Sequence, residues 1–407
     1  MFCARKCSSV GVVAVAMVLN AAVAQAAVTA AGAPVDIRNA YGLSGSTRTN
    51  YQGAGITIAV YAPSTAPYAG LQADVSFFSN AYGISDVALK YYDSQNLASN
   101  KVSGSEIALS TTGAATSSEL AMDIEYAHYM APKAKIVIVS GDSFGGAAQY
   151  AATVLGASVM TTSYASYESS YNTDAEKSSI IASSNRAGLA AQARLTSFSA
   201  AGDTGPYDFP ASSPFVAGVG ATNLFVNDQG ASTASRSSET SWSTTGGGTS
   251  GIFTTPAWQR AVNSGTFRKG PDLAIVGSGL NTMPVRVGGA YSQIAGTSLS
   301  SPLWAGIMAL VQEARTDAGK PTLGTTEFLT ALYALVGTAD YARAFNDITS
   351  SPSGAVNVAG PGFDTATGLG TPNVPFLISY LTSVPEPTSL GTAAVALGLL
   401  ARRVRRA

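Results

Sequence analysis

Short apolar runs alternate with longer helical stretches along most of the chain. The runs are rich in β-branched residues and have the length of buried strands. The strand candidates are residues 56–61, 135–140, 158–164, 195–200 and 215–219. The helix candidates are residues 118–130, 147–155, 177–192 and 303–316. This alternation predicts an α/β fold with a doubly wound, mostly parallel sheet, helices on both faces and a site at the carboxyl ends of the strands.

The first 26 residues have the pattern of a secretory signal peptide. Two basic residues precede an apolar run over residues 10–23, and Ala24–Ala26 forms a small-x-small cleavage site. We therefore expect an exported protein. Both cysteines, Cys3 and Cys7, lie within this segment, so the mature chain is expected to contain no disulfide.

The last segment, residues 383–407, combines Pro-Glu-Pro, a short apolar stretch and four arginines. The apolar stretch is shorter than the roughly 20 residues that span a bilayer comfortably, and the arginines favour a cytoplasmic end. The segment resembles the PEP-CTERM sorting signal of Gram-negative bacteria. That resemblance implies processing by an exosortase-type enzyme and a final location outside the cell or on its surface. The alternative is an ordinary C-terminal anchor.

Charged residues make up 12% of the 407 residues, about half of the usual share of roughly 25%. The net charge of −1 gives no basic footprint for nucleic acid, so nucleic-acid binding is not expected. The length is ample for one large hydrophobic core. These properties suit an exported enzyme.

The run Gly296–Pro302 offers a candidate nucleophile, Ser298, just before an apolar helix. Backbone N–H groups at a helix N-terminus favour developing negative charge. A serine nucleophile also needs a base, which is most often histidine. The chain has one histidine, His128, whose neighbours indicate a packed core residue. The base of Ser298 would therefore be a carboxylate, whereas the structural alternative makes Ser298 a helix N-cap.

Glu119 and Asp123 are the candidate carboxylates, four residues apart in the predicted helix 118–130. That spacing places both on one face, where two close carboxylates share a proton because they cannot both ionise cheaply. Such a pair can accept a proton from a serine at acid pH. The alternative is that Thr116 and Glu119 form a capping box.

Together these segments resemble the sedolisins, which are serine-carboxyl peptidases with a subtilisin-like fold. In that family Glu-x-x-x-Asp stands on one helix and is followed by Ala-Pro-x-Ala, here residues 131–134, and the nucleophile lies in Gly-Thr-Ser. A further Asp lies in a Ser-Gly-Asp-Ser-Gly-like loop, here Ala201–Gly205. Segments 209–214, 256–259 and 270–272 add to the resemblance, which covers residues 34–382.

The resemblance implies a secreted serine-carboxyl endopeptidase that acts on polypeptides and favours acid pH. It assigns Ser298 as nucleophile, Glu119 as general base, Asp123 as the residue that orients Glu119, and Asp203 as a protonated oxyanion donor. The alternative for Asp203 is an ordinary turn residue. We further expect a monomer.

A calcium site is also implied by the resemblance. Its ligands would be the carboxylates of Asp347 and Asp364 and the carbonyls of Ile348, Gly360 and Gly362. Carboxylates and backbone carbonyls are the oxygen ligands that Ca²⁺ prefers. The alternative is a pair of loop aspartates that form Asx turns.

Two other functions remain open at this point. The chain could be a surface or matrix binding protein that retains a peptidase scaffold. It could also be a Ser-His-Asp subtilisin, although the first strand candidate carries no Asp at its end. A glycine run at residues 246–248 either lets an extended peptide approach the backbone or acts as a flexible connector.

Overall fold

The structure is a computed structural model that describes residues 28–43, 50–63, 67–96, 102–109 and 117–385. The predicted signal peptide, residues 1–26, lies outside the described residues, and so does all of the predicted sorting tail beyond residue 385. Within those described ranges, no helix is long and apolar enough to cross a membrane.

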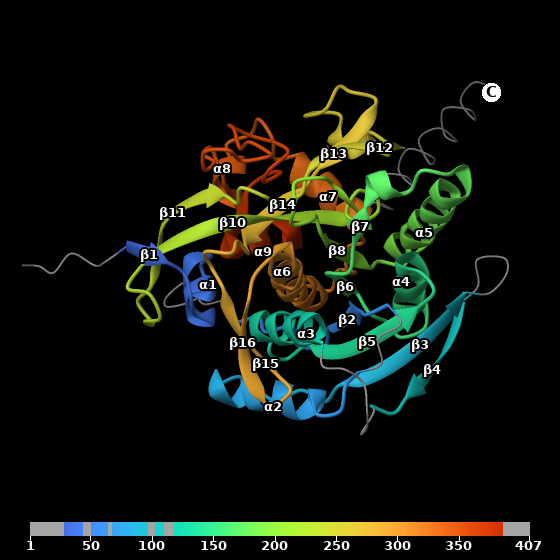
Figure 1. Ribbon diagram of the computed structural model, residues 1–407, viewed down its shortest axis with the longest axis vertical. Helices are drawn as coiled ribbons and strands as arrows, with labels where there is room; N and C mark the ends of the chain where they lie inside the picture. The colour runs from blue at the N-terminus through green and yellow to red at the C-terminus, as the bar shows by residue number, and fades with distance from the viewer. Residues whose placement is uncertain (1–27, 44–49, 64–66, 97–101, 110–116, 386–407) are drawn as a thin grey trace, which may run out of the picture.

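A ten-stranded sheet forms the middle layer (Figure 1). The strand order is β1-β10-β8-β6-β2-β5-β3-β4, and β11 and β14 also pair with β10. All pairs among β14, β10, β8, β6, β2, β5 and β3 are parallel, whereas β1, β4 and β11 join antiparallel at the margins. The predicted doubly wound, mostly parallel sheet is therefore confirmed. The strands are β1 Val28–Ala30, β2 Thr57–Tyr61, β3 Lys90–Asn96, β4 Val102–Ile107, β5 Lys135–Gly141, β6 Val159–Thr162, β8 Thr196–Ala200, β10 Ala217–Asn227, β11 Ser235–Ser241 and β14 Leu273–Val276.

Helices cover both faces of this sheet (Figure 1). Successive residues of a strand point to opposite faces, and both sets are buried in hydrophobic cores. Ile58 and Val60 of β2 point into the larger core with α3 (Ser118–Met130) and α6 (Thr297–Asp317). Ala59 and Tyr61 point to the opposite face, into a smaller core with α4 (Phe144–Thr153) and α5 (Asp174–Gln192). Both faces of the central strands are therefore buried, as in other parallel sheets that lie between helices.

Smaller elements surround these layers. The further helices are α1 Pro34–Ala40, α2 Leu71–Ala81, α7 Thr325–Tyr333, α8 Tyr341–Ala344 and α9 Val374–Ser383, with 3-10 turns at Glu168–Ser170 and Ala257–Gln259. The further strand pairs are β7 Ser166–Tyr167 with β9 Asp208–Phe209, β12 Gly248–Thr254 with β13 Phe267–Gly270, β15 Met283–Val287 with β16 Ala290–Ile294, and β17 Phe345–Asn346 with β18 Thr371–Pro372.

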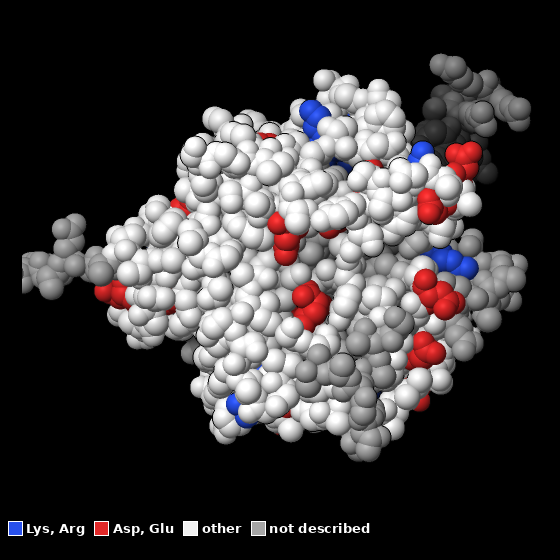
Figure 2. All heavy atoms as spheres, viewed as in Figure 1, with Lys and Arg blue, Asp and Glu red and all other residues white. Residues whose placement is uncertain are grey.

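Charged side chains are sparse on the face of the molecule in Figure 2. The charged groups are scattered over this face, and the view shows no continuous basic patch. This agrees with the low charged content of the chain.

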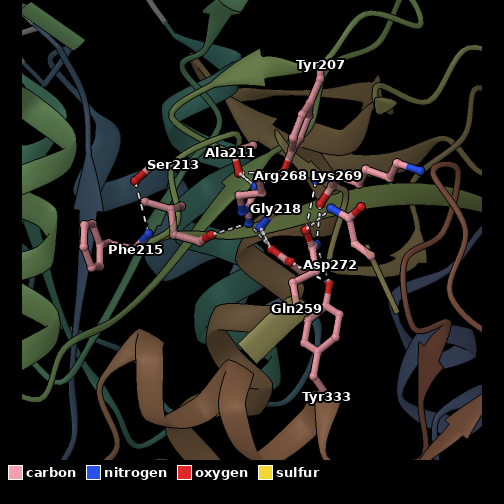
Figure 3. A network of polar contacts seen from close by, with 12 residues as sticks. Tyr207, Ala211, Ser213, Phe215, Gly218, Gln259, Arg268, Lys269, Asp272 and Tyr333 are labelled. Carbon is pink, nitrogen blue, oxygen red and sulfur yellow. Dashed lines mark hydrogen bonds and ion pairs between the residues drawn. The ribbon is translucent and has the colours of Figure 1, made fainter. Parts of the chain in front are cut away.

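The three sequence segments at 209–214, 256–259 and 270–272 meet around one buried arginine, Arg268 (Figure 3). Its guanidinium donates to the hydroxyl of Tyr207, to the carbonyl of Ala211 at 2.7 Å and to Oδ2 of Asp272 at 2.5 Å. Asp272 also accepts from the Gly218 N–H and from the Tyr333 hydroxyl. Arg268 and Asp272 are fully buried, and losing one partner of such a pair costs about 3–5 kcal/mol. The network thus holds in place the segment that runs from the Asp203 loop to the start of β10.

Candidate active site

Helix α3 carries both candidate carboxylates. Ser117 is its N-cap and accepts from the Leu120 N–H at 3.2 Å, so Glu119 does not occupy the capping-box position of this helix. Thr116 lies outside the described residues. Glu119 is partly buried and Asp123, one turn later, is fully buried. The Glu119 carboxylate is therefore available for chemistry rather than for capping.

Helix α6 brings Ser298 to Glu119. The hydroxyls of Ser298 and Ser163 lie near enough to the Glu119 carboxyl to lower its pKa. Burial is the larger effect, however, and it raises the pKa of Glu119 above its usual value. The Oε1 atom of Glu119 is buried without a hydrogen-bond partner. A serine hydroxyl therefore faces a carboxylate that holds protons more tightly than usual.

Ser163, at the end of β6, is a site residue that the sequence did not reveal. Its hydroxyl lies 2.5 Å from Oδ1 of Asp123 and 2.9 Å from the carbonyl oxygen of Ser298. One hydroxyl carries one proton and cannot donate to both acceptors. The hydroxyl therefore donates to one of them at a time, and to the Ser298 carbonyl when Asp123 is protonated.

Burial and charge both favour that protonated form of Asp123. Burial raises the pKa of Asp123 well above its usual range, and the charge of Glu119 raises it further. The Oδ2 atom of Asp123 is buried without a partner, as is Oε1 of Glu119. A proton held between the two carboxylates would satisfy both atoms.

Asp203 lies at the N-terminus of α6. Its Oδ1 accepts from the backbone N–H of Thr297 at 2.8 Å and from the Thr297 hydroxyl at 2.7 Å. Gly296 precedes Thr297 with φ +125°, and a Cβ on Gly296 would lie 2.6 Å from Oδ2 of Asp203. Glycine is thus required here by both backbone conformation and space. The structure places Asp203, Thr297 and Ser298 around one helix terminus.

These residues line a cavity of about 510 Å³. Its lining is Ser163, Ala165, Ser166, Tyr167, Ser170, Ala200, Gly202, Asp203, Thr204, Asp208, Thr297 and Ser298. Asp208 is a second residue that the sequence analysis missed, although it directly precedes the Phe209–Pro214 segment. Burial and the charge of Asp203 raise the pKa of Asp208 to about 7, and its Oδ1 has no hydrogen-bond partner.

The glycine run at 246–248 packs against the Asp203 loop. The Gly246 N–H donates to the Gly202 carbonyl at 2.6 Å, and the Gly247 N–H donates to the Gly205 carbonyl at 3.1 Å. A Cβ on Gly246 would lie 2.1 Å from the carbonyl oxygen of Ala201. These glycines let two backbone segments of this chain come close, so the flexible-connector interpretation does not hold for them.

His128 takes no part in this arrangement. It is fully buried in α3, and its Nε2 lies 2.7 Å from the carbonyl oxygen of Ser85. Burial lowers the pKa of His128. His128 does not line the cavity that contains Ser298. This removes the only histidine of the chain as the base of Ser298.

The candidate calcium ligands come together in two adjoining loops. Asp347 Oδ2 accepts from the Gly362 N–H at 2.9 Å, and Asp364 Oδ2 accepts from the Gly360 N–H at 3.1 Å. Burial raises the pKa of Asp364, and the charges of both aspartates help to raise the pKa of Tyr341. In the described part of the chain no group of three or more His, Cys, Asp or Glu side chains could hold a metal. An ion here would need backbone carbonyls, as the predicted ligand set has.

Comparisons with known proteins identify the family of this chain. The subtilase family matches residues 99–370. Kumamolisin of Bacillus sp. (strain MN-32) is 32% identical over 292 residues, which cover 62% of this chain and 49% of that protein. Xanthomonalisin of Xanthomonas sp. (strain T-22) is 33% identical over 193 residues, covering 42% of this chain and 22% of that protein. The chain thus spans about half the length, or less, of these curated relatives.

The fold has a counterpart among solved structures. Pseudomonas sedolisin, a serine-carboxyl proteinase complexed with two molecules of pseudo-iodotyrostatin, superposes with a TM-score of 0.70. The match covers 87% of this chain and 99% of that chain, at 23% identity. At that identity the likeness establishes the shared fold, and the site must be argued from its own residues.

Proposed function

The chain belongs to the subtilase family and its relatives are sedolisin-type peptidases, and from this premise we propose that it is a serine-carboxyl endopeptidase. The observation that carries the proposal is that Ser298, which lines the cavity, has its hydroxyl near enough to the Glu119 carboxyl to lower its pKa. A carboxylate in that position can do the work that histidine does in other serine peptidases. The substrates would be polypeptides.

Proton transfer follows from this contact. Ser298 Oγ attacks the carbonyl carbon of the scissile bond, and its proton passes to Glu119. Glu119 then returns the proton to the leaving nitrogen as the C–N bond breaks. Water attacks the resulting ester while Glu119 accepts a proton from it. The ester C–O bond then breaks as Glu119 returns that proton to Ser298 Oγ. Asp123 holds a proton beside Glu119 and orients it, as the third member of a triad does elsewhere.

Asp203 would stabilise the oxyanion of each tetrahedral intermediate by donating a hydrogen bond. Only a protonated carboxyl can donate. Its Oδ1 already accepts two hydrogen bonds from Thr297, so the donated proton would be on Oδ2. The backbone N–H groups at the start of α6 would supply further stabilisation.

This mechanism favours acid pH, because the oxyanion donor must be protonated. At low pH the rate is limited by protonation of Glu119. Burial raises the pKa of Glu119, so activity should rise with pH through that raised value. A maximum below neutrality is expected, because Asp203 must carry a proton in order to donate.

Calcium would be bound by Asp347, Asp364 and the carbonyls of Ile348, Gly360 and Gly362. The support is the proximity of the two loops and the all-oxygen donor set. Bound there, the ion would join residues 345–348 to residues 360–364 and stabilise the fold. It would take no direct part in bond cleavage.

The proposal also includes export through residues 1–26, processing of residues 383–407 by an exosortase-type enzyme, and a monomeric state. The sequence pattern of the two ends supports the export and the processing. Mass spectrometry of the protein recovered from outside the cell would show whether both segments are removed.

The alternative function is a non-catalytic binding protein on the same scaffold. A peptide aldehyde labelled with ¹³C at its reactive carbon distinguishes the two, since only a working serine adds to that carbon to give a hemiacetal. We expect a hemiacetal resonance with the wild type and none with Ser298→Ala. A properly folded wild type that gives no such resonance at any pH would favour the binding protein.

A further inference from the structure

One segment far along the chain reaches back to the Asp203 loop. Residues 350–359 lie between the two candidate calcium loops, and they are anchored by the N–H of Ala359, which donates to the Ser351 hydroxyl at 2.8 Å. The Val356 N–H donates to the Ser243 carbonyl at 2.9 Å. The segment therefore runs beside residues 243–247, which themselves pack on the Asp203 loop.

Asn357 makes the direct connection. Its side-chain amide nitrogen donates to the carbonyl of Gly205 at 2.8 Å and to the carbonyl of Thr245 at 2.9 Å. An amide has two hydrogens, so both are used on two different segments. Asn357 is partly buried, while its neighbours Val356 and Val358 are 59% and 65% exposed.

Val356 covers Gly205 from the same side. A Cβ on Gly205 would lie 2.5 Å from Cγ1 of Val356, and Gly205 has φ +102°. The carbonyl of Gly205 also accepts from the Gly247 N–H at 3.1 Å. The end of the Asp203 loop is thus held by one side chain above it and by two donors to one carbonyl.

The loop needs such support. Gly202 and Gly205 flank Asp203 and Thr204, and glycine gives the backbone more freedom than any other residue. The Asp203 side chain is itself exposed, so packing does not fix it. Thr297 restrains the carboxylate and Gly246 restrains the start of the loop. Asn357, together with Val356 and the Gly247 N–H, restrains the end of the loop.

We propose that Asn357 is a positioning residue that holds the 202–205 loop so that Asp203 meets the oxyanion. This rests on the proposed function, because the role of Asp203 belongs to it. Oxyanion stabilisation depends on donors that are already in place before charge develops. A loop that is free to shift loses that advantage without losing its substrate-binding surface.

The kinetic test compares wild type with Asn357→Ala and Asn357→Asp. The alanine removes both donors, and the aspartate keeps the size but places acceptor oxygens against two carbonyls. We expect kcat to fall by about 10- to 100-fold in both, because small misplacements in a site have effects of that size. KM should stay within about twofold, since binding in the ground state is retained.

Asn227→Ala is the matched control. Asn227 also donates through its amide, to Ser235 at 3.4 Å, but it lies at the exposed end of β10. Its variant should keep wild-type kcat and KM. An unchanged kcat in Asn357→Ala, or a fall in kcat that follows a loss of folded protein, would overturn the proposal.

Hydrogen–deuterium exchange provides a readout that needs no activity. Peptides that contain residues 202–205 and 246–247 should exchange faster in Asn357→Ala than in wild type and Asn227→Ala. Unchanged exchange would overturn the proposal even if kcat fell. A wild type without peptidase activity would contradict the proposed function instead, and the exchange result would still decide whether Asn357 holds the loop.

Discussion

Pro302 explains the position of Ser163 in the site. In a helix the N–H of residue 302 would donate to the carbonyl of Ser298, but proline has no N–H. The Ser298 carbonyl accepts instead from the Ser163 hydroxyl at 2.9 Å. Ser163 therefore joins the end of β6 to the start of α6 and, through Asp123, to α3. Pro302 thus leaves the Ser298 carbonyl without a helical N–H donor, and this carbonyl accepts from the Ser163 hydroxyl instead.

Ser163→Ala should move the acid limb of the activity profile to higher pH. The Ser163 hydroxyl lowers the pKa of Glu119 and Asp123, so its loss raises both values. Glu119 then remains protonated to a higher pH, and we expect a shift of about one pH unit, the size of one hydrogen bond to a charged group. The pH dependence of kcat/KM measures it.

Ser163→Thr is the control for that substitution, because it keeps the hydroxyl. It should retain an acid limb close to that of the wild type. An acid limb that does not move in Ser163→Ala would show that the hydroxyl does not act on the base.

At the scale of elements, α3 connects the site to a hairpin. Glu125 is fully buried, and its Oε2 accepts from the Arg286 N–H of β15 at 2.9 Å. Asp74 of α2 accepts from the N–H groups of Gly288 and Gly289 in the hairpin turn. The same helix therefore presents Glu119 and Asp123 to Ser298 and Ser163, and Glu125 to the hairpin that precedes Ser298.

Glu125→Gln should make the free energy of unfolding depend less on pH between about pH 4.5 and pH 9, where the wild type loses stability. Burial raises the pKa of Glu125 from 4.5 to about 9, so the folded state keeps a proton that the unfolded state has released. Stability is then fully present below about pH 4.5 and falls as pH rises towards 9, by up to about 1.4 kcal/mol per pH unit. Glutamine cannot ionise, so this contribution disappears.

Urea unfolding at pH 5 and pH 8 measures the difference. The variant should match the wild type within about 1 kcal/mol at pH 5, because the glutamine oxygen can still accept from the Arg286 N–H. It should exceed the wild type in stability at pH 8. Equal slopes of stability against pH in the two proteins would contradict the assignment.

Some helices and strands can be predicted from the sequence more accurately than others. Helix 118–130 and strands β2, β5, β6 and β8 were predicted close to their observed bounds. Strand β10 was predicted as residues 215–219 but continues to Asn227, where it pairs with the antiparallel strands β1 and β11. Helix α6 begins at Thr297 rather than Leu303, since its first turns are rich in serine and carry a proline. Strands β3 and β4 were missed: they pair antiparallel at the sheet margin, and β4 is largely exposed.

The same limit applies to the site. Four candidate residues could be named because each stands in a local motif. Ser163 and Asp208 could not, because their roles depend on contacts with α3, α6 and the Asp203 loop that are distant in sequence. Asn357 could not be named either, because it lies 152 residues from Gly205 along the chain.

At the scale of the whole molecule, stability rests on burial and loop contacts, because the chain is poor in charge and both of its cysteines lie in residues 1–7. The buried Arg268 network joins three segments on one side of the sheet (Figure 3). The candidate calcium loops join residues 345–348 to residues 360–364 on the path to α9. An ion at that position would restrain the segment that carries Asn357.

Calcium should raise the melting temperature of the wild type in a concentration-dependent way. Binding to the folded state alone adds about 2.7 kcal/mol at a concentration of 100 Kd. Asp364→Ala should abolish the dependence, whereas Asp317→Ala, at the exposed end of α6, should keep it. A melting temperature that is insensitive to calcium in the wild type would contradict the proposed site.

The most direct test of the central claim is the rate of casein hydrolysis from pH 3 to pH 9 by the wild type, Glu119→Gln and Ser298→Ala. If Ser298 is the nucleophile and Glu119 its base, the wild type has its maximum below neutrality. Both variants should then lose at least about 10³-fold in kcat at every pH. A wild-type profile that peaks above neutrality, or a Glu119→Gln variant with wild-type rates, would contradict the account.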